Sequence, residues 1–381
     1  MRDSAVELPE GGLAVVVGPG LGEGAVAEAL GAIAAAGSAT ADGPLIGGFR
    51  ERVKRRELSI DSAWVELDPR EQGRNLLDPE PRIDTERDYF ARTVLAAELC
   101  LPRWVNPWQP IGCDCRIKVS LSSELLGAEA ALPAEGVEHV RVWGSDAVCG
   151  LNVGEPALLA ARFVSLSAPA PSRGLPAPTP SALLARLLAR TRPLLDCELV
   201  EGVKRVLAEP LRLGGAEAVD FDLAFTAGGE PALVLGDQVL ACTSAPGSVR
   251  ALLGNWLALT ALAALRRECG GRWLLAGVVE PEEHLEPYAA YLLAHLYALA
   301  AGRLGATFVV ATKSDAFLKG VEDAVFESVL PVGRVRVYEA AGTPAELTLR
   351  ELKVREDGTV EGARFTKAAK VVVKRRLGQG G

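Results

Sequence analysis

Hydrophobic runs and amphipathic stretches alternate at both ends of this 381-residue chain. Near the start, Leu13–Val17 is an apolar run rich in valine, typical of a strand buried on both faces; a glycine loop follows, and then a helical stretch at 25–35 that ends at Gly37. Toward the end, the pattern predicts helices at 248–267, 287–301 and 316–325, separated by strands at 273–279 and 306–311. Elements of these lengths predict right-handed crossovers and a parallel sheet, with the loops after Val17, Val279 and Ala311 along one edge.

The middle of the chain has a different pattern. Short segments of alternating polarity at 60–67, 116–121 and 137–142 are separated by turn residues, which predicts a β-rich region. Five prolines then lie between Pro169 and Pro180, where they predict a stiff connection before a helix at 182–190. Two alternating runs around a glycine turn, at 219–225 and 232–235, predict a hairpin.

These patterns predict five segments. They are the first part of an α/β core (1–43), a β-rich inserted region (44–168), a proline-rich connection (169–180), a helical segment with the second part of the core (181–340), and a C-terminal hairpin with a basic tail (341–381).

Composition places the chain among folded globular proteins. With 49% hydrophobic and 24% charged residues it is neither disordered nor fibrous, and a formal charge of −8 opposes a general nucleic-acid coat, though not a local basic patch. The N-terminus lacks the basic and apolar segments of a signal peptide, and the most apolar stretch, 249–265, falls short of the ~20 residues that a membrane span requires. We therefore expect a cytoplasmic protein that contacts no membrane.

The seven cysteines include no CxxC pair and fit neither a closed disulfide framework nor a four-ligand zinc site. A single Met, 24 Pro and an excess of Arg are typical of a heat-adapted protein, although a GC-rich genome gives a similar Arg excess. In a thermophile, Cys113 and Cys115 are candidates for a disulfide; the alternative is two buried thiols on one strand face. His284 and His295 fit packing or capping roles, and we expect no metal site.

The glycine loop after the first strand allows three interpretations. A phosphate loop, GxxxxGK[ST], aligned from the first glycine would require glycine at Glu23, lysine at Gly24 and a hydroxyl at Ala25. A dinucleotide fingerprint fits Gly20, Gly22 and Ala25, but 38–43 is not the acidic second strand that it requires. A plain turn between strand and helix accounts for the glycines without any ligand. The loop residues are Gly18, Pro19, Gly20, Leu21, Gly22, Glu23 and Gly24, followed by Ala25.

Two later segments carry a more specific pattern. Residues 273–287 read WLLAGVVEPEEHLEP, and residues 306–318 read ATFVVATKSDAFL. They resemble the Walker B strand and the switch region of ABC-type ATPases, in particular the small archaeal and bacterial subgroup similar to RecF and SMC heads. Ser244 and Gly247 resemble the signature serine and glycine of that family, with one residue more between them, and the glycine loop falls where Walker A belongs. The resemblance implies an α/β, P-loop NTPase-like fold of the ABC/SMC-head type, with a mainly parallel sheet and an inserted β-rich region.

The resemblance also indicates which catalytic groups are missing. In the family, the Walker A lysine and hydroxyl bind phosphate and magnesium, the first Walker B acid steadies the metal, the next glutamate polarises water, and the switch histidine contacts the γ-phosphate. Those positions here are Gly24, Ala25, Val279, Glu280 and Lys313, so that only Glu280 is retained. Ser314 and Asp315 complete the switch-like segment. Phosphoryl transfer depends on electrostatic stabilisation by such groups, so we do not expect hydrolysis by this chain alone.

Three functional hypotheses follow. The first is a degenerate ATPase-fold protein that acts as a binding or assembly subunit, either as a homodimer or with an active ATPase whose site Ser244 and Gly247 would complete. The second is an active hydrolase of ATP with magnesium, in which Glu280 acts and Lys313 replaces the loop lysine; otherwise Lys313 is solvated or paired with Glu280. The third is a dinucleotide-binding protein.

Two basic clusters are candidates for nucleic-acid contact, although short runs of like charge are usually solvated surface. One comprises Arg50, Arg52, Lys54, Arg55 and Arg56; the other comprises Lys367, Lys370, Lys374, Arg375 and Arg376.

Overall fold

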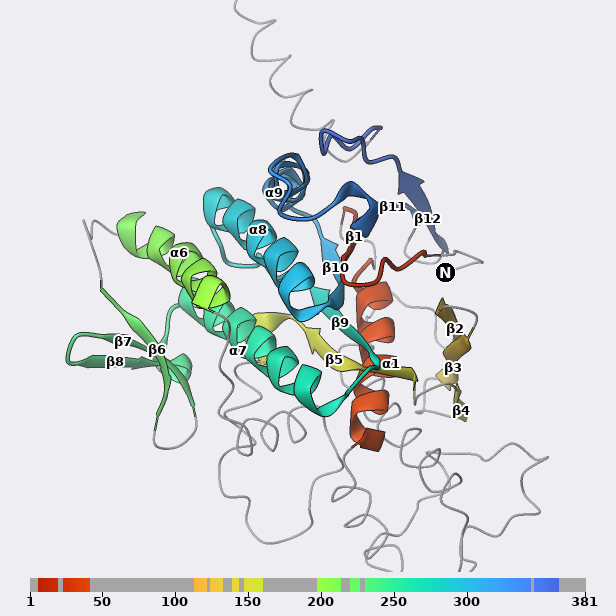
Figure 1. The fold of residues 1–381 in the computed structure, drawn as a ribbon, viewed down its shortest axis with the longest axis horizontal. Helices are drawn as coiled ribbons and strands as arrows, with labels where there is room; N and C mark the ends of the chain where they lie inside the picture. The colour runs from red at the N-terminus through yellow and green to blue at the C-terminus, as the bar shows by residue number, and fades with distance from the viewer. Residues whose placement is uncertain are drawn as a thin grey trace, which may run out of the picture.

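A six-stranded sheet forms the centre of the computed structural model, in the order β12-β11-β1-β10-β9-β5 (Figure 1). The structure describes residues 6–19, 23–41, 113–121, 124–132, 139–143, 147–159, 197–213, 220–226, 230–343 and 346–362. Every neighbouring pair in the sheet is parallel except β11 and β12. The expected α/β class with a mainly parallel sheet is therefore confirmed. The strands are β1 (Leu13–Val17), β5 (Val148–Gly154), β9 (Trp273–Val279), β10 (Ala306–Thr312), β11 (Val335–Thr343) and β12 (Glu346–Leu352).

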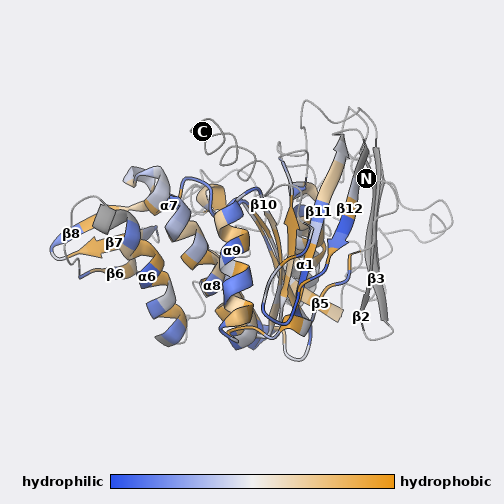
Figure 2. Ribbon diagram, turned by 90° about the horizontal axis from the view of Figure 1, so that it is seen from above, coloured by the Kyte–Doolittle hydropathy of each residue, from blue (hydrophilic) through white to orange (hydrophobic). Residues whose placement is uncertain are grey.

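Helices cover both faces of this sheet. The chain passes from β1 across the sheet to β5 and later returns from β9 through β10 to β11, so right-handed crossovers place the two sets of helices on opposite faces. Figure 2 shows helix α1 on one side of β10 and helices α7, α8 and α9 on the other. The helices are α1 (Gly24–Ala41) on the first face, α7 (Gly247–Glu268), α8 (Pro287–Leu304) and α9 (Asp315–Phe326) on the second, and α6 (Cys197–Leu213), which packs on α7 and α8.

Helix α1 lies unusually close to the sheet because both surfaces are built from small residues. A Cβ on Gly277 of β9 would lie 1.9 Å from the carbonyl oxygen of Ala27, and Gly31 faces the same strand. The helix also continues past Gly37, where the sequence predicted its end. The buried Ser38 hydroxyl explains this extension, because it accepts a hydrogen bond from the amide of Gly150 and donates to that residue's carbonyl, both at 2.6 Å.

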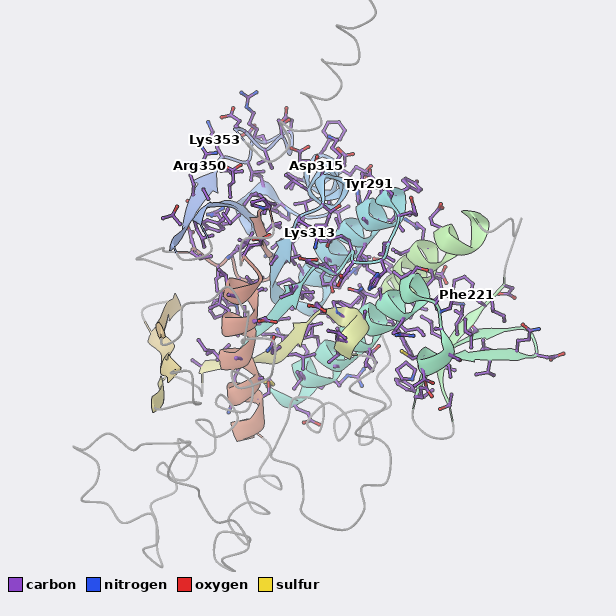
Figure 3. All side chains as sticks on the ribbon, turned by 180° about the vertical axis from the view of Figure 1, so that it is seen from behind. Phe221, Tyr291, Lys313, Asp315, Arg350 and Lys353 are labelled. Carbon is purple, nitrogen blue, oxygen red and sulfur yellow. A yellow bond between two sulfur atoms is a disulfide. The ribbon has the colours of Figure 1, made fainter. Side chains whose placement is uncertain are left out.

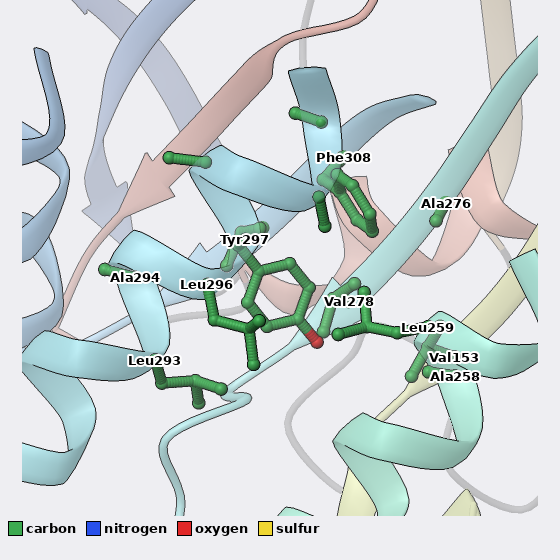
Figure 4. Packing of buried hydrophobic residues seen from close by; sticks show 14 of the residues in the cluster. Val153, Ala258, Leu259, Ala276, Val278, Leu293, Ala294, Leu296, Tyr297 and Phe308 are labelled. Carbon is green, nitrogen blue, oxygen red and sulfur yellow. The ribbon is translucent and has the colours of Figure 1, made fainter. Parts of the chain in front are cut away.

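The largest part of the core lies between the sheet and helices α7 and α8. Figure 4 shows Tyr297 of α8 packed among Phe308, Val278 and Leu259, which come from β10, β9 and α7. The rings of Tyr297 and Phe308 meet edge to face at 5.1 Å. Helix α7, at 22 residues, is long and apolar enough to cross a bilayer, contrary to the sequence-based expectation, but 83% of its apolar stretch is buried within the protein, as in a core helix.

Two antiparallel sheets of three strands lie outside the main sheet. In the first, β2 includes the expected segment at 116–121 and β4 overlaps the expected segment at 137–142; the second contains the expected hairpin. The expected elements at 60–67 and 182–190 lie outside the described residues. The strands are β2 (Cys113–Leu121), β3 (Glu124–Leu132) and β4 (His139–Trp143), then β6 (Asp222–Phe225), β7 (Pro231–Leu235) and β8 (Gln238–Ala241).

The boundary expected at residue 168 needs correction. Strand β5 pairs in parallel with β9, so residues assigned to the inserted region supply an edge strand of the main sheet. The sequence of β5, VCGLNVG, contains two glycines and an asparagine and therefore lacks the continuous apolar run that marked β1.

A disulfide joins Cys149 of β5 to Cys269, the residue that caps the end of α7. The two Cα atoms are 6.1 Å apart, within the usual range for such a bond. The sequence named Cys113 and Cys115 as candidates in a thermophile, beside the alternative of two buried thiols, and did not single out this pair. Both lie on β2, and their side chains are outside the described part of the protein.

Candidate functional site

The carboxyl ends of β1, β10 and β9 meet at one edge of the sheet, as the predicted crossovers require. The amide of Gly18 donates to the carbonyl of Thr312 at 3.2 Å, and the amide of Glu280 donates to the carbonyl of Ala311 at 2.7 Å. Three segments that are far apart in the sequence therefore lie side by side here. This edge is the place where ligands bind in open α/β sheets.

An ion pair joins two of these segments. Lys313 Nζ lies 2.6 Å from Glu280 Oε2, and the hydrogen bond to Glu280 raises the pKa of Lys313. Figure 3 labels Lys313, just after β10, and Asp315, the first residue of α9. Glu280 has a φ of +44°, which is uncommon for a residue with a Cβ. Of the two roles considered for Lys313, the structure has the pairing with Glu280; a role toward phosphate stays a prediction.

A buried carboxylate lies next to this ion pair. Glu282 is 7% exposed, and its Oε1 accepts a hydrogen bond from the hydroxyl of Thr312. Its Oε2 is buried with no hydrogen-bond partner among the described residues, and burial raises the pKa of Glu282 to about 7. The Thr312 oxygen also accepts from the amide of Ser314 at 3.0 Å. Thr312 therefore connects the switch-like segment to the turn after β9.

The sequence attributed the acids before Pro287 to the first turn of the next helix, and the structure gives that role to one of them. Glu286 caps α8, and its carboxylate accepts from the amides of Tyr288 at 2.8 Å and Ala289 at 2.5 Å. A carboxylate at a helix N-terminus satisfies free amides and complements the helix dipole.

The sequence did not predict the pair of buried side chains, from helices α7 and α8, whose hydrogen bonds hold the turn after β9. Asn255 of α7 donates to the carbonyl of Pro281 at 3.0 Å, and Tyr297 donates its hydroxyl proton to Asn255 at 2.6 Å. Both side chains are buried. The available signal was a lone asparagine inside an otherwise apolar helix, because a buried amide requires partners.

The two positions that the resemblance assigns to a lysine and a metal-binding acid contact one another through apolar groups. Gly24 opens α1, and a Cβ placed on it would lie 3.1 Å from Cγ1 of Val279. Neither of these two positions itself carries a cation or a carboxylate. Gly20, Leu21 and Gly22 lie outside the described residues, so the dinucleotide interpretation stays a prediction, and so do the roles of the exposed Pro19 and of the partly buried Ala25.

The signature-like residues are exposed, and Gly247 lies beside the turn that follows β9. A Cβ on Gly247 would lie 3.4 Å from Cγ of His284, and the Ser244 hydroxyl donates to the carbonyl of Ala241 at 3.0 Å. In the switch-like segment, Ser314 caps α9 by accepting from the amide of Phe317 at 3.2 Å, while Asp315 is exposed.

The expected packing role of His295 agrees with its surroundings. Its ring lies 4.9 Å from that of Tyr291, and its Nδ1 lies 3.7 Å from a carboxylate oxygen of Glu327. Within the described ranges, no three His, Cys, Asp or Glu side chains converge as metal ligands would. Both basic clusters, at 50–56 and 367–376, are outside those ranges, and nucleic-acid contact by them stays a prediction.

Glu282 makes stability depend on pH. The pKa of Glu282 is raised from 4.5 to about 7 in the folded protein. Its protonated form therefore stabilises the folded state fully below pH 4.5, and this stabilisation is lost as the pH rises through 7. We expect Glu282→Gln, which does not titrate, to gain stability relative to the wild type by about 3 kcal/mol between pH 4.5 and pH 8. Urea unfolding of both proteins at several pH values measures this difference, and a constant difference across that range would contradict it.

Comparison with known proteins gives weak likenesses. No family model and no curated protein matches the chain. The SMC head domain from Thermotoga maritima aligns at 11% identity and a TM-score of 0.38, over 92% of this chain and 94% of that one. The Smc head domain of Pyrococcus furiosus bound to the C-terminal domain of ScpA aligns at 10% identity and a TM-score of 0.37, over 96% and 94%. TM-scores this low do not establish a shared fold, so the architecture rests on the strand order itself.

Proposed function

We propose that this protein is a catalytically degenerate, ABC/SMC-like ATPase-fold protein that acts as a binding or assembly subunit. The main support is the contact of Gly24 with Val279. It lies where the resemblance requires the phosphate-binding lysine and the metal-binding acid, at the edge that also carries the Glu280–Lys313 ion pair.

Phosphoryl transfer needs positive charge around the transferred group. A lysine and a magnesium ion usually supply it, each stabilising the transition state by several kcal/mol. At the site described above, one lysine is present, and Glu280 already neutralises it at 2.6 Å. The carboxylate that would polarise water is therefore paired with the only cation available among the described site residues, so the arrangement does not favour the active-hydrolase hypothesis.

Calorimetric titration with ATP and magnesium, together with phosphate release by wild type and Glu280→Gln, tests this proposal. We expect both proteins to release phosphate at the same background rate. If Glu280 acted as a general base, its replacement would lower a real hydrolysis rate by about 10²–10⁴-fold. Such a loss would establish an active ATPase, and Lys313→Met would then show whether that lysine serves the phosphate.

The binding role is supported by the exposure of the signature-like segment. Ser244 and Gly247 lie on the surface at the start of α7 and are accessible to a second chain. The proposal allows a homodimer or a heterodimer with an active ATPase. Sedimentation velocity of the purified chain separates these alternatives, because a heterodimeric subunit is expected to sediment as a monomer when alone.

A further inference from the structure

An exposed surface formed by helices α8 and α9 combines aromatic rings with carboxylates. Tyr288 is 50% exposed, and its ring stacks on that of Tyr291 with 5.8 Å between the centroids. Phe326, the last residue of α9, is 69% exposed, more than any other large hydrophobic side chain that the structure describes. The α8–α9 surface consists of Tyr288, Tyr291, His295, Asp323, Phe326 and Glu327.

Two carboxylates of α9 share one lysine beside these rings. Lys319 Nζ lies 3.3 Å from Glu322 Oε2 and 3.0 Å from Asp323 Oδ1. The other Asp323 oxygen accepts from the Tyr291 hydroxyl at 3.2 Å, a bond that orients the carboxylate without neutralising it. One negative charge therefore remains unbalanced within this group.

Glu327 adds a further carboxylate to the surface. Its side chain is 56% exposed, and among the described residues it pairs only with His295, whose Nδ1 lies 3.7 Å away. Burial lowers the pKa of His295 from 6.5, so the imidazole is mostly neutral at pH 7 and leaves the charge of Glu327 in place. Arg205 of α6 acts on the same imidazole and offsets part of that charge. Carboxylates beside exposed aromatic rings attract the side chains of lysine and arginine.

The C-terminal segment passes along α9 just before the described residues end. The amide of Val360 donates to Glu322 Oε1 at 2.9 Å, and a Cβ on Gly358 would lie 2.0 Å from the carbonyl oxygen of Glu322. The next segment, 363–381, contains six lysines and arginines and no aspartate or glutamate. Its first lysine, Lys367, is five residues past the last described one, a distance of at most about 17 Å for an extended chain. A segment tethered this closely has an effective concentration in the millimolar range, so weak charge pairs can hold it.

We propose that the basic segment 363–381 docks on the α8–α9 surface of its own chain. Its cations pair with Asp323 and Glu327. Their aliphatic stems and charged ends cover the exposed rings of Tyr288 and Phe326, where cation–π attraction adds to the charge pairing. The segment is then bound within the chain instead of being free for the nucleic-acid contact that its charge suggested. No residue of this surface belongs to the glycine loop or to the Glu280–Lys313 ion pair, so the inference stands or falls independently of the proposed function.

Carbodiimide cross-linking of the full chain, followed by mass spectrometry, tests where the segment lies. The reagent joins a lysine to a carboxylate without a spacer, so it reports only direct contacts. In a mixture of isotopically labelled and unlabelled protein, we expect links within one chain from lysines of 363–381 to Asp323 or Glu327. Links to these acids only between chains would assign the surface to a second copy and overturn the inference. Links mainly to other carboxylates, or no links from this segment, would overturn it as well.

Limited digestion with trypsin measures how far the surface protects the segment. We expect Glu327→Gln with Phe326→Ser to speed cleavage within 363–381 by about fivefold, because one charge and one ring are lost. Both positions are exposed, so these variants are expected to keep the fold, which circular dichroism checks. The matched control is Asp237→Asn with Val239→Ser, which changes an exposed carboxylate and an exposed apolar side chain at the β7–β8 hairpin. Cleavage at the same rate in the wild type and in both double variants would contradict docking.

Discussion

Replacing Gly277 with alanine is expected to lower the free energy of unfolding by about 3 kcal/mol or more, because the added Cβ would clash with backbone atoms that cannot move independently. It would lie 1.9 Å from the carbonyl oxygen of Ala27 and 2.9 Å from Cα of Gly31, both of which are backbone atoms of α1. Helix α1 would have to move off β9, and its contacts with β5 and β10 would be disturbed as well. Urea unfolding followed by circular dichroism measures the change.

Gly302 offers the matched control. It lies in α8, is exposed, and has no atom within 4 Å of an added Cβ. Alanine there is expected to raise stability by about 0.5–1 kcal/mol, since glycine in a helix interior loses more conformational freedom on folding. Equal effects of the two substitutions would mean that α1 does not approach the sheet as described.

Breaking the Cys149–Cys269 disulfide is expected to cost about 2–5 kcal/mol of stability. The bond closes a loop with a sequence separation of 120 residues, and long loops gain the most from cross-linking in the chain-entropy account. Both cysteines are buried, so reduction also leaves two thiols in a space shaped for the bond. Unfolding of the oxidised protein, of the reduced protein and of Cys149→Ala with Cys269→Ala measures the cost.

A variant at Cys242 is the control that distinguishes loss of the disulfide from other effects of the reducing agent on stability. The Cys242 thiol is free and buried, and burial raises its pKa to about 11, which makes it a poor nucleophile. We expect Cys242→Ala to retain the full difference between the oxidised and reduced states. Alkylation of Cys149 and Cys269 in the unfolded, unreduced protein would show that the bond had not formed.

The sequence predicted those strands whose apolar runs are continuous. Strands β1, β9 and β10 are buried along their whole length, and such strands are readable without any knowledge of their neighbours. Strand β5 was missed because its glycine allows close approach of both neighbours: a Cβ on Gly150 would lie 1.6 Å from the carbonyl oxygen of Leu275 on β9 and 2.8 Å from Cβ of Ala34 on α1. Small residues that are required by a close tertiary contact do not produce the periodic hydrophobic pattern from which a strand is predicted.

In the candidate site too, the sequence predicted the arrangement of the strands and loops but not the contacts between individual side chains. Right-handed crossovers predicted that the loops after β1, β9 and β10 would share an edge, and they do. The hydrogen bond of Thr312 with Glu282, and the position of Glu23 over Gly18, depend on how individual side chains pack and had no signature in the sequence. Asn255 stood out as a polar interruption of α7, but its partners Pro281 and Tyr297 are identified only by the fold.

The main sheet also constrains how the chain tolerates changes in length. The residues between Ala41 and Val148 leave from the end of α1 and return at the start of β5, and these two elements pack on one another. The entropy of closing such an excursion grows only with the logarithm of its length, so doubling it costs roughly 0.6 kcal/mol. Chain closure by itself would therefore add little free energy if the segments of that stretch outside β2, β3 and β4 were lengthened. Because both ends of the stretch are held by the contact between α1 and β5, a change in its length need not alter the strand order of the main sheet.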